Sequence, residues 1–167
     1  MFRKIDYTER MSEAITALAQ SGAFLTVAAN GKVNTMTIGW GTIGYIWGRP
    51  IMMVLVRPSR YTFGLLKAAG EFTVSIPLSG LAEELKVCGS KSGRTLDKLA
   101  LTGLATVKGQ TVSAPVIADC DLYYECKVVY QTQLDPTMLA DTCQKWYPQD
   151  DYHTLFFGEI TACYAKE

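Results

Sequence analysis

The stretch that most constrains this fold is residues 34–62, because its pattern requires a pair of strands that ends in a polar turn. Residues 34–47 are rich in β-branched and aromatic side chains, which are typical of strands. Residues 51–56 are apolar throughout, and a short run without polar alternation indicates a strand covered on both faces. We therefore expect the two segments to pair about the turn at residues 48–50.

The register of that pairing brings polar side chains together. It would place Trp40 near Arg57 and Met36 near Tyr61, within a residue or two. The turn at residues 57–62 would then lie beside the polar start of the first strand. Two guanidinium groups, two hydroxyls and a phenol at this strand edge could hold an anion that carries an aromatic group.

Composition bounds the remaining possibilities. Residues 1–167 suit one domain with a single core that needs no metal or disulfide. Sixteen basic and sixteen acidic side chains leave no net charge, which argues against a broad surface for nucleic acid or for an anionic membrane. No apolar run suits a signal peptide or a membrane span, so we expect a cytoplasmic protein.

The five cysteines are odd in number and widely spaced, and the chain has a single histidine. This pattern gives poor support to a zinc site, and we predict no metal site. The cysteines are interpreted as reduced thiols that mostly pack inertly in the interior.

Local signals predict the other elements. Helical spacing and capping residues predict helices at residues 8–20, 62–70, 79–87 and 135–144, with Thr8, Thr62 and Ser79 as N-caps and Pro136 at the first position. Strand patterns predict strands at residues 23–29, 71–76, 111–117, 122–133 and 154–164. Asn30-Gly31 predicts a hairpin turn, because a type I′ turn needs positive φ at both central residues. About seven strands joined mostly by short turns favour a small antiparallel barrel with helices outside.

Two polar loops favour a phosphate site. The first N–H groups and the positive dipole end of the helix at residues 62–70 would face Ser59 and Arg60. The second loop, residues 88–98, carries small residues, hydroxyls and cations. Taken singly, each loop is more simply a turn, a helix cap or an exposed loop, whereas two of them in one neutral domain favour phosphate binding. Neither a Walker A loop nor a G-x-G-x-x-G motif is present.

No catalytic residue can be assigned from the sequence alone. His153 precedes an apolar strand and could carry a proton or contact a ligand, although a lone histidine at the start of a strand is more often structural. No Ser/His/Asp or Cys/His arrangement can be argued. If the protein is an enzyme, we therefore expect a cofactor to perform the difficult step.

Several short motifs follow one another in an order and spacing that are more specific than any one of them. They are Asn34-Thr35-Met36-Thr37 with Trp40, Arg57 to Thr62, Gly70 to Pro77, Ser92-Gly93-Arg94 with Asp97-Lys98, Ala114 to Ile117, Glu125 to Lys127 and Phe157 to Ile160. Together they resemble the flavin reductase-like proteins of the FMN-binding split barrel fold, from about residue 22 to about residue 161. The resemblance implies a mainly β fold with flanking helices: an antiparallel six-stranded split barrel of Greek-key type. It also implies a homodimer with FMN near the subunit interface.

The resemblance further implies which residues bind the cofactor. Those at the flavin ring or ribityl chain are Asn34, Thr35, Met36, Thr37 and Trp40, and those at the phosphate end are Arg57, Ser59, Arg60, Tyr61 and Thr62. The second loop, which closes on the phosphate and the ring edge, comprises Ser90, Lys91, Ser92, Gly93 and Arg94. Residues 135–151 match no family pattern, which leaves the substrate side unassigned.

The function implied is that of an FMN-dependent oxidoreductase, either an NAD(P)H:flavin reductase or a flavoredoxin-like carrier. NAD(P)H is the expected electron donor, and the acceptor is a small molecule or a protein. An alternative is a non-catalytic module that senses or stores a flavin or another flat cofactor such as haem, although the single histidine argues against haem. A third possibility is an ordinary barrel whose polar loops are only caps and turns.

Overall fold

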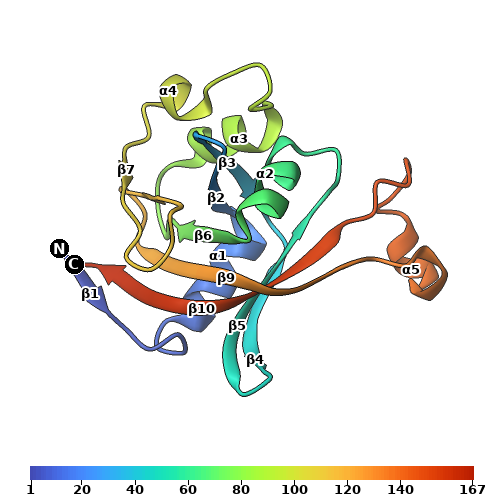
Figure 1. The fold of residues 1–167 in the computed structure, drawn as a ribbon, viewed down its shortest axis with the longest axis horizontal. Coiled ribbons are helices and arrows are strands. Elements are labelled where there is room, and N and C mark those ends of the chain that lie inside the picture. Colours follow the sequence, from blue (N-terminus) through green and yellow to red (C-terminus); the bar gives the residue numbers. More distant parts are fainter.

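The computed structural model describes residues 1–167, and its main feature is one large antiparallel sheet that curls into a split barrel (Figure 1). The strand order is β3-β2-β6-β9-β10-β5-β4, and β1 adds an eighth strand beside β10. The strands of this sheet are β1 (Phe2–Lys4), β2 (Ala23–Ala29), β3 (Lys32–Ile38), β4 (Gly41–Ile46), β5 (Arg49–Val56), β6 (Glu71–Ile76), β9 (Leu122–Gln133) and β10 (Thr154–Lys166). A separate two-stranded ribbon pairs β7 (Thr106–Val107) with β8 (Val116–Ile117).

The helices lie outside the sheet (Figure 1). They are α1 (Met11–Gln20), α2 (Tyr61–Ala69), α3 (Ala82–Ser90), α4 (Lys98–Thr102), α5 (Asp141–Gln144) and the 3₁₀ helix η1 (Pro136–Met138). Helices α2, α3 and α4 gather on the side of β2 and β3, whereas α5 lies beyond the far ends of β9 and β10 (Figure 1). None of these helices is long and apolar enough to cross a membrane.

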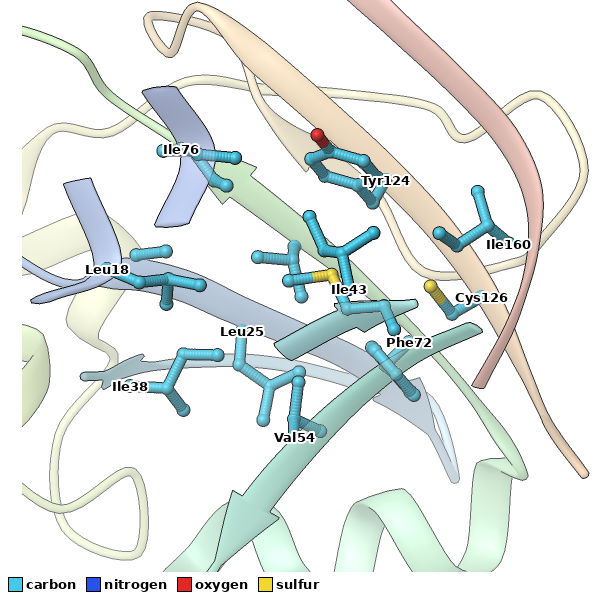
Figure 2. Packing of buried hydrophobic residues seen from close by; sticks show 14 of the residues in the cluster. Leu18, Leu25, Ile38, Ile43, Val54, Phe72, Ile76, Tyr124, Cys126 and Ile160 are labelled. Atoms are coloured by element: carbon cyan, nitrogen blue, oxygen red, sulfur yellow. The ribbon is translucent and has the colours of Figure 1, made fainter. Parts of the chain in front are cut away.

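Two hydrophobic clusters hold the sheet and helices together. In the larger cluster, side chains from α1 and from most strands point toward one another inside the barrel, as Leu18, Leu25, Phe72 and Tyr124 do in Figure 2. The smaller cluster covers the outer face of β2 and β9 with residues of α3 and of the β7–β8 region. Residues 23–27 of β2 and residues 122–126 of β9 are therefore buried on both faces of the sheet, and α2 and α3 pack on β2.

The predicted fold class is confirmed, although the sheet has eight strands rather than six. Strands β2, β6 and β9 begin and end where their sequence patterns predict, and β10 continues two residues further than expected. The hairpin turn is also confirmed, because Asn30 and Gly31 adopt φ values of 54° and 72°.

The prediction of a single strand over residues 34–47 is wrong. The chain forms β3 and β4, which are separated by Gly39 and Trp40, because the Asn30-Gly31 turn commits β3 to pairing with β2. Only β4 pairs with β5, about a tight turn at Trp47-Gly48, where both residues have positive φ. Nor is β5 covered equally on both faces, since every second side chain is only half-buried near its end.

The three predicted N-caps are also wrong. Helix α1 begins at Met11, because the backbone N–H and hydroxyl of Thr8 bond to the Asp6 carboxylate instead. Helix α2 begins one residue before Thr62, and α3 begins after Leu81, which adopts a positive φ. The C-terminal end of α2 is as predicted, with Gly70 in the left-handed region at φ 66°.

Only the end of the predicted strand at residues 111–117 is a strand, and a buried carboxylate explains why. Glu125 on β9 is fully buried, and its oxygens accept hydrogen bonds from the N–H groups of Gln110 (2.7 Å) and Thr111 (2.6 Å) and from the Tyr164 hydroxyl (2.7 Å). The loop therefore satisfies its backbone on this carboxylate rather than on a neighbouring strand. Burial alone raises the pKa of Glu125, but these hydrogen bonds outweigh it and leave the pKa below its ordinary value.

The predicted helix at residues 135–144 is divided into η1 and α5, with Pro136 at the first position of η1 as expected. All five cysteines are free. Burial raises the pKa of the Cys120, Cys126 and Cys163 thiols, which favours inert packing. No cluster of three His, Cys, Asp or Glu side chains has the arrangement of a metal site.

We predict that Glu125→Gln lowers the free energy of unfolding at pH 7 by about 2–4 kcal/mol, since it disturbs a buried and fully bonded carboxylate. Because the pKa of Glu125 is lowered in the folded protein, its contribution is present above the ordinary carboxyl pKa and is lost as the pH falls through the folded value. Urea unfolding at several pH values measures both effects. The control is Glu159→Gln, which removes a surface pair with Arg49 and should cost less than about 1 kcal/mol. Equal losses in the two variants would contradict the assignment.

Candidate functional site

The start of α2 and the loop after α3 enclose a small pocket that we call the phosphate pocket. Its volume is ≈ 160 Å³, which suits one compact group. The lining residues are Ser59, Arg60, Tyr61, Thr62, Ser90, Lys91, Ser92, Gly93, Arg94 and Lys98. Four of them are cations and none is a carboxylate, so the pocket carries an uncompensated positive charge that favours an anion.

Two of these cations are held in place by backbone carbonyls rather than by acidic side chains. Arg60 Nη1 donates to Gly89 O (2.9 Å), and Lys98 Nζ donates to Cys88 O (3.1 Å), so both point at the last turn of α3. Burial lowers the pKa of Arg60, with a smaller contribution from the nearby Arg57 charge. Burial also lowers the pKa of Lys98 to about 8. A bound anion would compensate both charges.

The second loop closes the pocket through Arg94 and Gly93. Arg94 Nη1 donates to Ser59 O (2.9 Å), and its guanidinium lies 5.7 Å from the centre of the Tyr61 ring. A Cβ on Gly93 would lie 2.6 Å from the Tyr61 ring and would also overlap the Asn34 side chain. Only glycine therefore allows the loop to lie this close to β3 and α2.

The polar groups of several predicted site residues form hydrogen bonds within the fold and are not free to meet a ligand. Asn34 Nδ2 donates to Thr62 Oγ1 (2.7 Å), which ties β3 to α2. The Thr35 hydroxyl is fully buried against β2 and donates to Leu25 O (3.3 Å). The Ser90 hydroxyl donates back into α3, and Lys91 is exposed at the mouth of the pocket.

Arg57 and Ser59 are placed differently from the prediction, because both hold the segment 135–153. Arg57 donates to Asp151 O and to Trp146 O, each at 2.9 Å, and its guanidinium lies 4.9 Å from the Tyr147 ring centre. It does not line the phosphate pocket. The Ser59 hydroxyl lines the pocket but donates to the Asp151 carboxylate, which also accepts from the Ser59 N–H (3.4 Å). A carboxylate thus occupies donors that were predicted for phosphate.

A second hollow, the ring pocket, adjoins the phosphate pocket at Arg60, which lines both. It has a volume of ≈ 210 Å³ and is lined by Met36, Thr37, Ile38, Gly39, Trp40, Leu55, Arg57, Arg60 and His153. The Thr37 hydroxyl is not free, since it donates to Leu85 O (2.6 Å). The other lining residues combine apolar and aromatic side chains with two arginines, and the apolar part suits a flat ring.

His153 belongs to an aromatic group that forms one wall of the ring pocket. Its ring lies 5.2 Å from that of Trp40, and its Nδ1 shares a 2.8 Å hydrogen bond with the Tyr147 hydroxyl. The Trp146 ring packs edge-on against Trp40 at 5.4 Å. Burial, aided by the Arg57 charge, lowers the pKa of His153 to about 4. The imidazole is therefore neutral near pH 7 and is no proton donor of the imidazolium kind.

The sequence did not single out Lys98, Trp146 or Tyr147 as site residues. For Lys98 a signal was present, because it is the last cation of the second polar loop, but its burial depends on α3 and α4 packing together. For Trp146 and Tyr147 no local signal exists, since contacts with residues distant in sequence, Arg57 and Trp40, bring them beside the ring pocket.

The fold and site thus define a split barrel with a cationic pocket for a compact anion beside an aromatic pocket for a flat ring. Residues 16–167 match the flavin reductase like domain, so the chain belongs to the flavin reductase-like family, whose members are flavin-related oxidoreductases. An uncharacterized protein of Archaeoglobus fulgidus is 30% identical over 137 residues, which are 82% of this chain and 68% of that protein.

Solved structures agree with the family assignment. The flavoredoxin of Methanosarcina acetivorans has a TM-score of 0.69 and 31% identity, over 88% of this chain and 69% of that one. An FMN-binding protein from Thermus thermophilus, solved with bound p-hydroxybenzaldehyde, has a TM-score of 0.70 and 26% identity, over 88% of this chain and 72% of that one. The expected resemblance to flavin reductase-like split barrels is therefore confirmed.

We predict that Arg60 and Arg57 respond differently to substitution, because only Arg60 lines the phosphate pocket. Arg60→Ala should reduce the affinity for FMN relative to riboflavin by about 2 kcal/mol, the scale of a charge-assisted hydrogen bond. Arg57→Ala should change the affinities for both ligands by the same factor, since Arg57 lines the ring pocket and holds the segment 135–153 but does not line the phosphate pocket. Fluorescence titrations with the two flavins measure the ratios. A loss of phosphate preference in Arg57→Ala would show that the placement of Arg57 is wrong.

We also predict that FMN affinity depends on pH through Lys98. The ammonium is charged below its pKa of about 8, so phosphate binding should weaken as the pH rises above that value. Lys98→Met should bind FMN about tenfold or more weakly at pH 7 and should lose this pH dependence. The exposed Lys108→Met serves as the control. If Lys98→Met bound FMN with unchanged affinity at pH 7, Lys98 would have no role in binding.

Proposed function

We propose that the protein binds FMN and acts as an oxidoreductase that takes electrons from NAD(P)H and passes them to a small molecule or a protein. The observation that carries this proposal is the carboxylate-free cationic pocket directly beside an aromatic pocket. FMN has the matching pair of groups, a dianionic phosphate and a flat ring. The residues that are present therefore fit this cofactor.

The chain's own residues would bind and orient the cofactor. Arg60, Arg94 and Lys98 would hold the phosphate together with the N–H groups at the start of α2. Met36 and Trp40 would contact the ring, and Trp146 would support Trp40 by its edge-on contact. Bound FMN supplies the ability to accept hydride and to release electrons.

The ring pocket offers no carboxylic acid or imidazolium near pH 7, which supports electron or hydride transfer by a bound cofactor over acid catalysis by side chains. The only histidine is neutral near pH 7, and no carboxylate lines the pocket. Similar proteins include two flavoredoxins, from Methanosarcina acetivorans and Desulfovibrio vulgaris. This likeness supports a flavoredoxin-like carrier as much as an NAD(P)H:flavin reductase.

The visible spectrum of the purified protein, before and after addition of FMN, tests binding. We expect a flavin spectrum, and protein that takes up no FMN would refute the proposal. Steady oxidation of NADH or NADPH with free FMN would identify a reductase. Bound FMN that is reduced only by another protein would identify a carrier. Tight binding without reduction by either donor would instead identify a non-catalytic flavin-binding module.

We further propose that the protein is a homodimer, as the family resemblance implies. Support comes from exposed aromatic side chains on the β4–β5 hairpin and the adjoining part of β9, where Trp47 and Tyr130 are 55% and 49% exposed. Their rings lie 6.0 Å apart, and both lie within 6 Å of Phe157. A cluster of this kind is typical of a surface that another chain covers.

We predict that Trp47→Asp converts the dimer into a monomer, because it places a charge in the centre of the aromatic cluster. Sedimentation equilibrium measures the mass of the particle. Leu101→Asp, an equally exposed apolar position on α4, is the control and should leave the mass unchanged. A wild-type protein that is monomeric at micromolar concentration would refute the dimer.

A further inference from the structure

The ring pocket is lined by two guanidinium groups and by no carboxylate. They belong to Arg57, which follows β5, and to Arg60, which precedes α2. Neither side chain takes part in an ion pair. The surface that suits a flat ring therefore also carries positive charge that no acidic side chain of the pocket compensates.

Of the two cations, only Arg57 belongs to the ring pocket alone. Arg60 also lines the phosphate pocket, where a bound phosphate would take up its charge. The two guanidinium groups are close enough for the charge of Arg57 to contribute to the lowered pKa of Arg60. With an anion in the phosphate pocket, Arg57 would be the cation that acts on a ring beside it.

The segment 135–153 holds Arg57 through neutral groups. The guanidinium donates to Asp151 O and Trp146 O, both at 2.9 Å, and lies over the Tyr147 ring. The Asp151 carboxylate bonds instead to the N–H and the hydroxyl of Ser59. The carbonyl dipoles thus fix the direction of the guanidinium and leave its net charge in place.

The charge of Arg57 already acts on one ring in the wall of the pocket. It lowers the pKa of His153, second only to burial, and the Asp151 carboxylate opposes it more weakly. Burial also raises the pKa of the Tyr147 phenol, so neither this phenol nor the imidazole is charged near pH 7. Of the titratable and charged groups around Arg57, Arg60 is thus a second cation and Asp151 is the one carboxylate.

A flavin ring changes its charge when it is reduced. The oxidised ring is neutral, and uptake of two electrons with one proton leaves a reduced ring that carries one negative charge. Uptake of a second proton makes the reduced ring neutral again. A cation beside the ring in a partly desolvated pocket stabilises the anionic form relative to both neutral forms.

We propose that Arg57 keeps the reduced flavin ring anionic and thereby raises the reduction potential of bound FMN. This inference rests on the proposed function, because it takes the ring pocket as the place of the flavin ring. A hydride from NAD(P)H supplies both electrons and the single proton, and leaves NAD(P)⁺. When the two electrons pass on to the acceptor, that proton is released to water. The pocket itself then needs no proton donor, as its neutral His153 and its lack of a carboxylate require.

The test is a redox titration of the FMN-loaded protein between about pH 6 and about pH 8, with the absorption spectrum of the reduced form recorded at each pH. The spectrum distinguishes an anionic from a neutral reduced flavin. One proton taken up with two electrons gives half the dependence of potential on pH that two protons give. We expect the anionic spectrum and the one-proton dependence for the wild type.

Four kinds of variant separate the charge of Arg57 from its contacts. Arg57→Gln and Arg57→Met remove the charge, and Gln keeps an N–H donor for the wall. Arg57→Lys keeps the charge, and Trp146→Ala disturbs the wall while Arg57 stays. Lys108→Met removes an exposed cation that lines neither pocket and is the control.

We expect Arg57→Gln and Arg57→Met to bind reduced FMN at least about tenfold more weakly, relative to oxidised FMN, than the wild type does. For a two-electron couple this factor lowers the potential by about 30 mV. Both variants should also take up the second proton at the lower pH values. Arg57→Lys, Trp146→Ala and Lys108→Met should keep the one-proton dependence.

Three results would overturn the inference while FMN binding stands. They are a neutral reduced flavin in the wild type, an unchanged potential in Arg57→Gln, and an equal fall of potential in Trp146→Ala and Arg57→Gln. The last would show that the wall, and not the charge, sets the potential. If the wild type binds no flavin, the proposed function itself fails.

Discussion

The site depends on two buried cations that donate hydrogen bonds to the last backbone carbonyls of α3. Arg60 and Lys98 donate to the carbonyls of Gly89 and Cys88, and no acidic side chain lines the phosphate pocket. Backbone dipoles orient these cations but do not neutralise them, so most of their charge stays available. An acidic partner would stabilise the empty pocket and weaken its hold on an anion. Without a bound anion, burial disfavours the charged forms of both side chains and lowers their pKa values.

Arg57 stabilises the wall beside the ring pocket. Through its bonds to Asp151 and Trp146 it fixes a segment that has little regular structure of its own. Trp146 then packs against Trp40, and His153 completes the aromatic wall. The segment 135–153 thus supplies the outer wall beside the ring pocket, and Asp151 also ties it to Ser59.

Local patterns in the sequence predicted the parts of the fold that depend on neighbouring residues. The Asn30-Gly31 turn, β6 and β9 follow from turn chemistry and from runs of β-forming residues. The meeting of residues 59–62 with residues 90–94 was also predicted, because both loops resemble known motifs. What the sequence could not reveal depends on distant contacts. The Glu125 carboxylate replaces a strand partner for residues 110–112, and Asp151 reaches Ser59 from the other end of the chain.

The most direct test of a carboxylate-free phosphate site is the phosphorus-31 NMR spectrum of bound FMN as a function of pH. The second ionisation of a free phosphate monoester has a pKa of about 6. Surrounded by Arg60, Arg94 and Lys98, the bound phosphate should remain dianionic to well below that value, so its resonance should not move between about pH 8 and pH 5. A bound phosphate whose resonance titrates near pH 6, as in free FMN, would contradict the account.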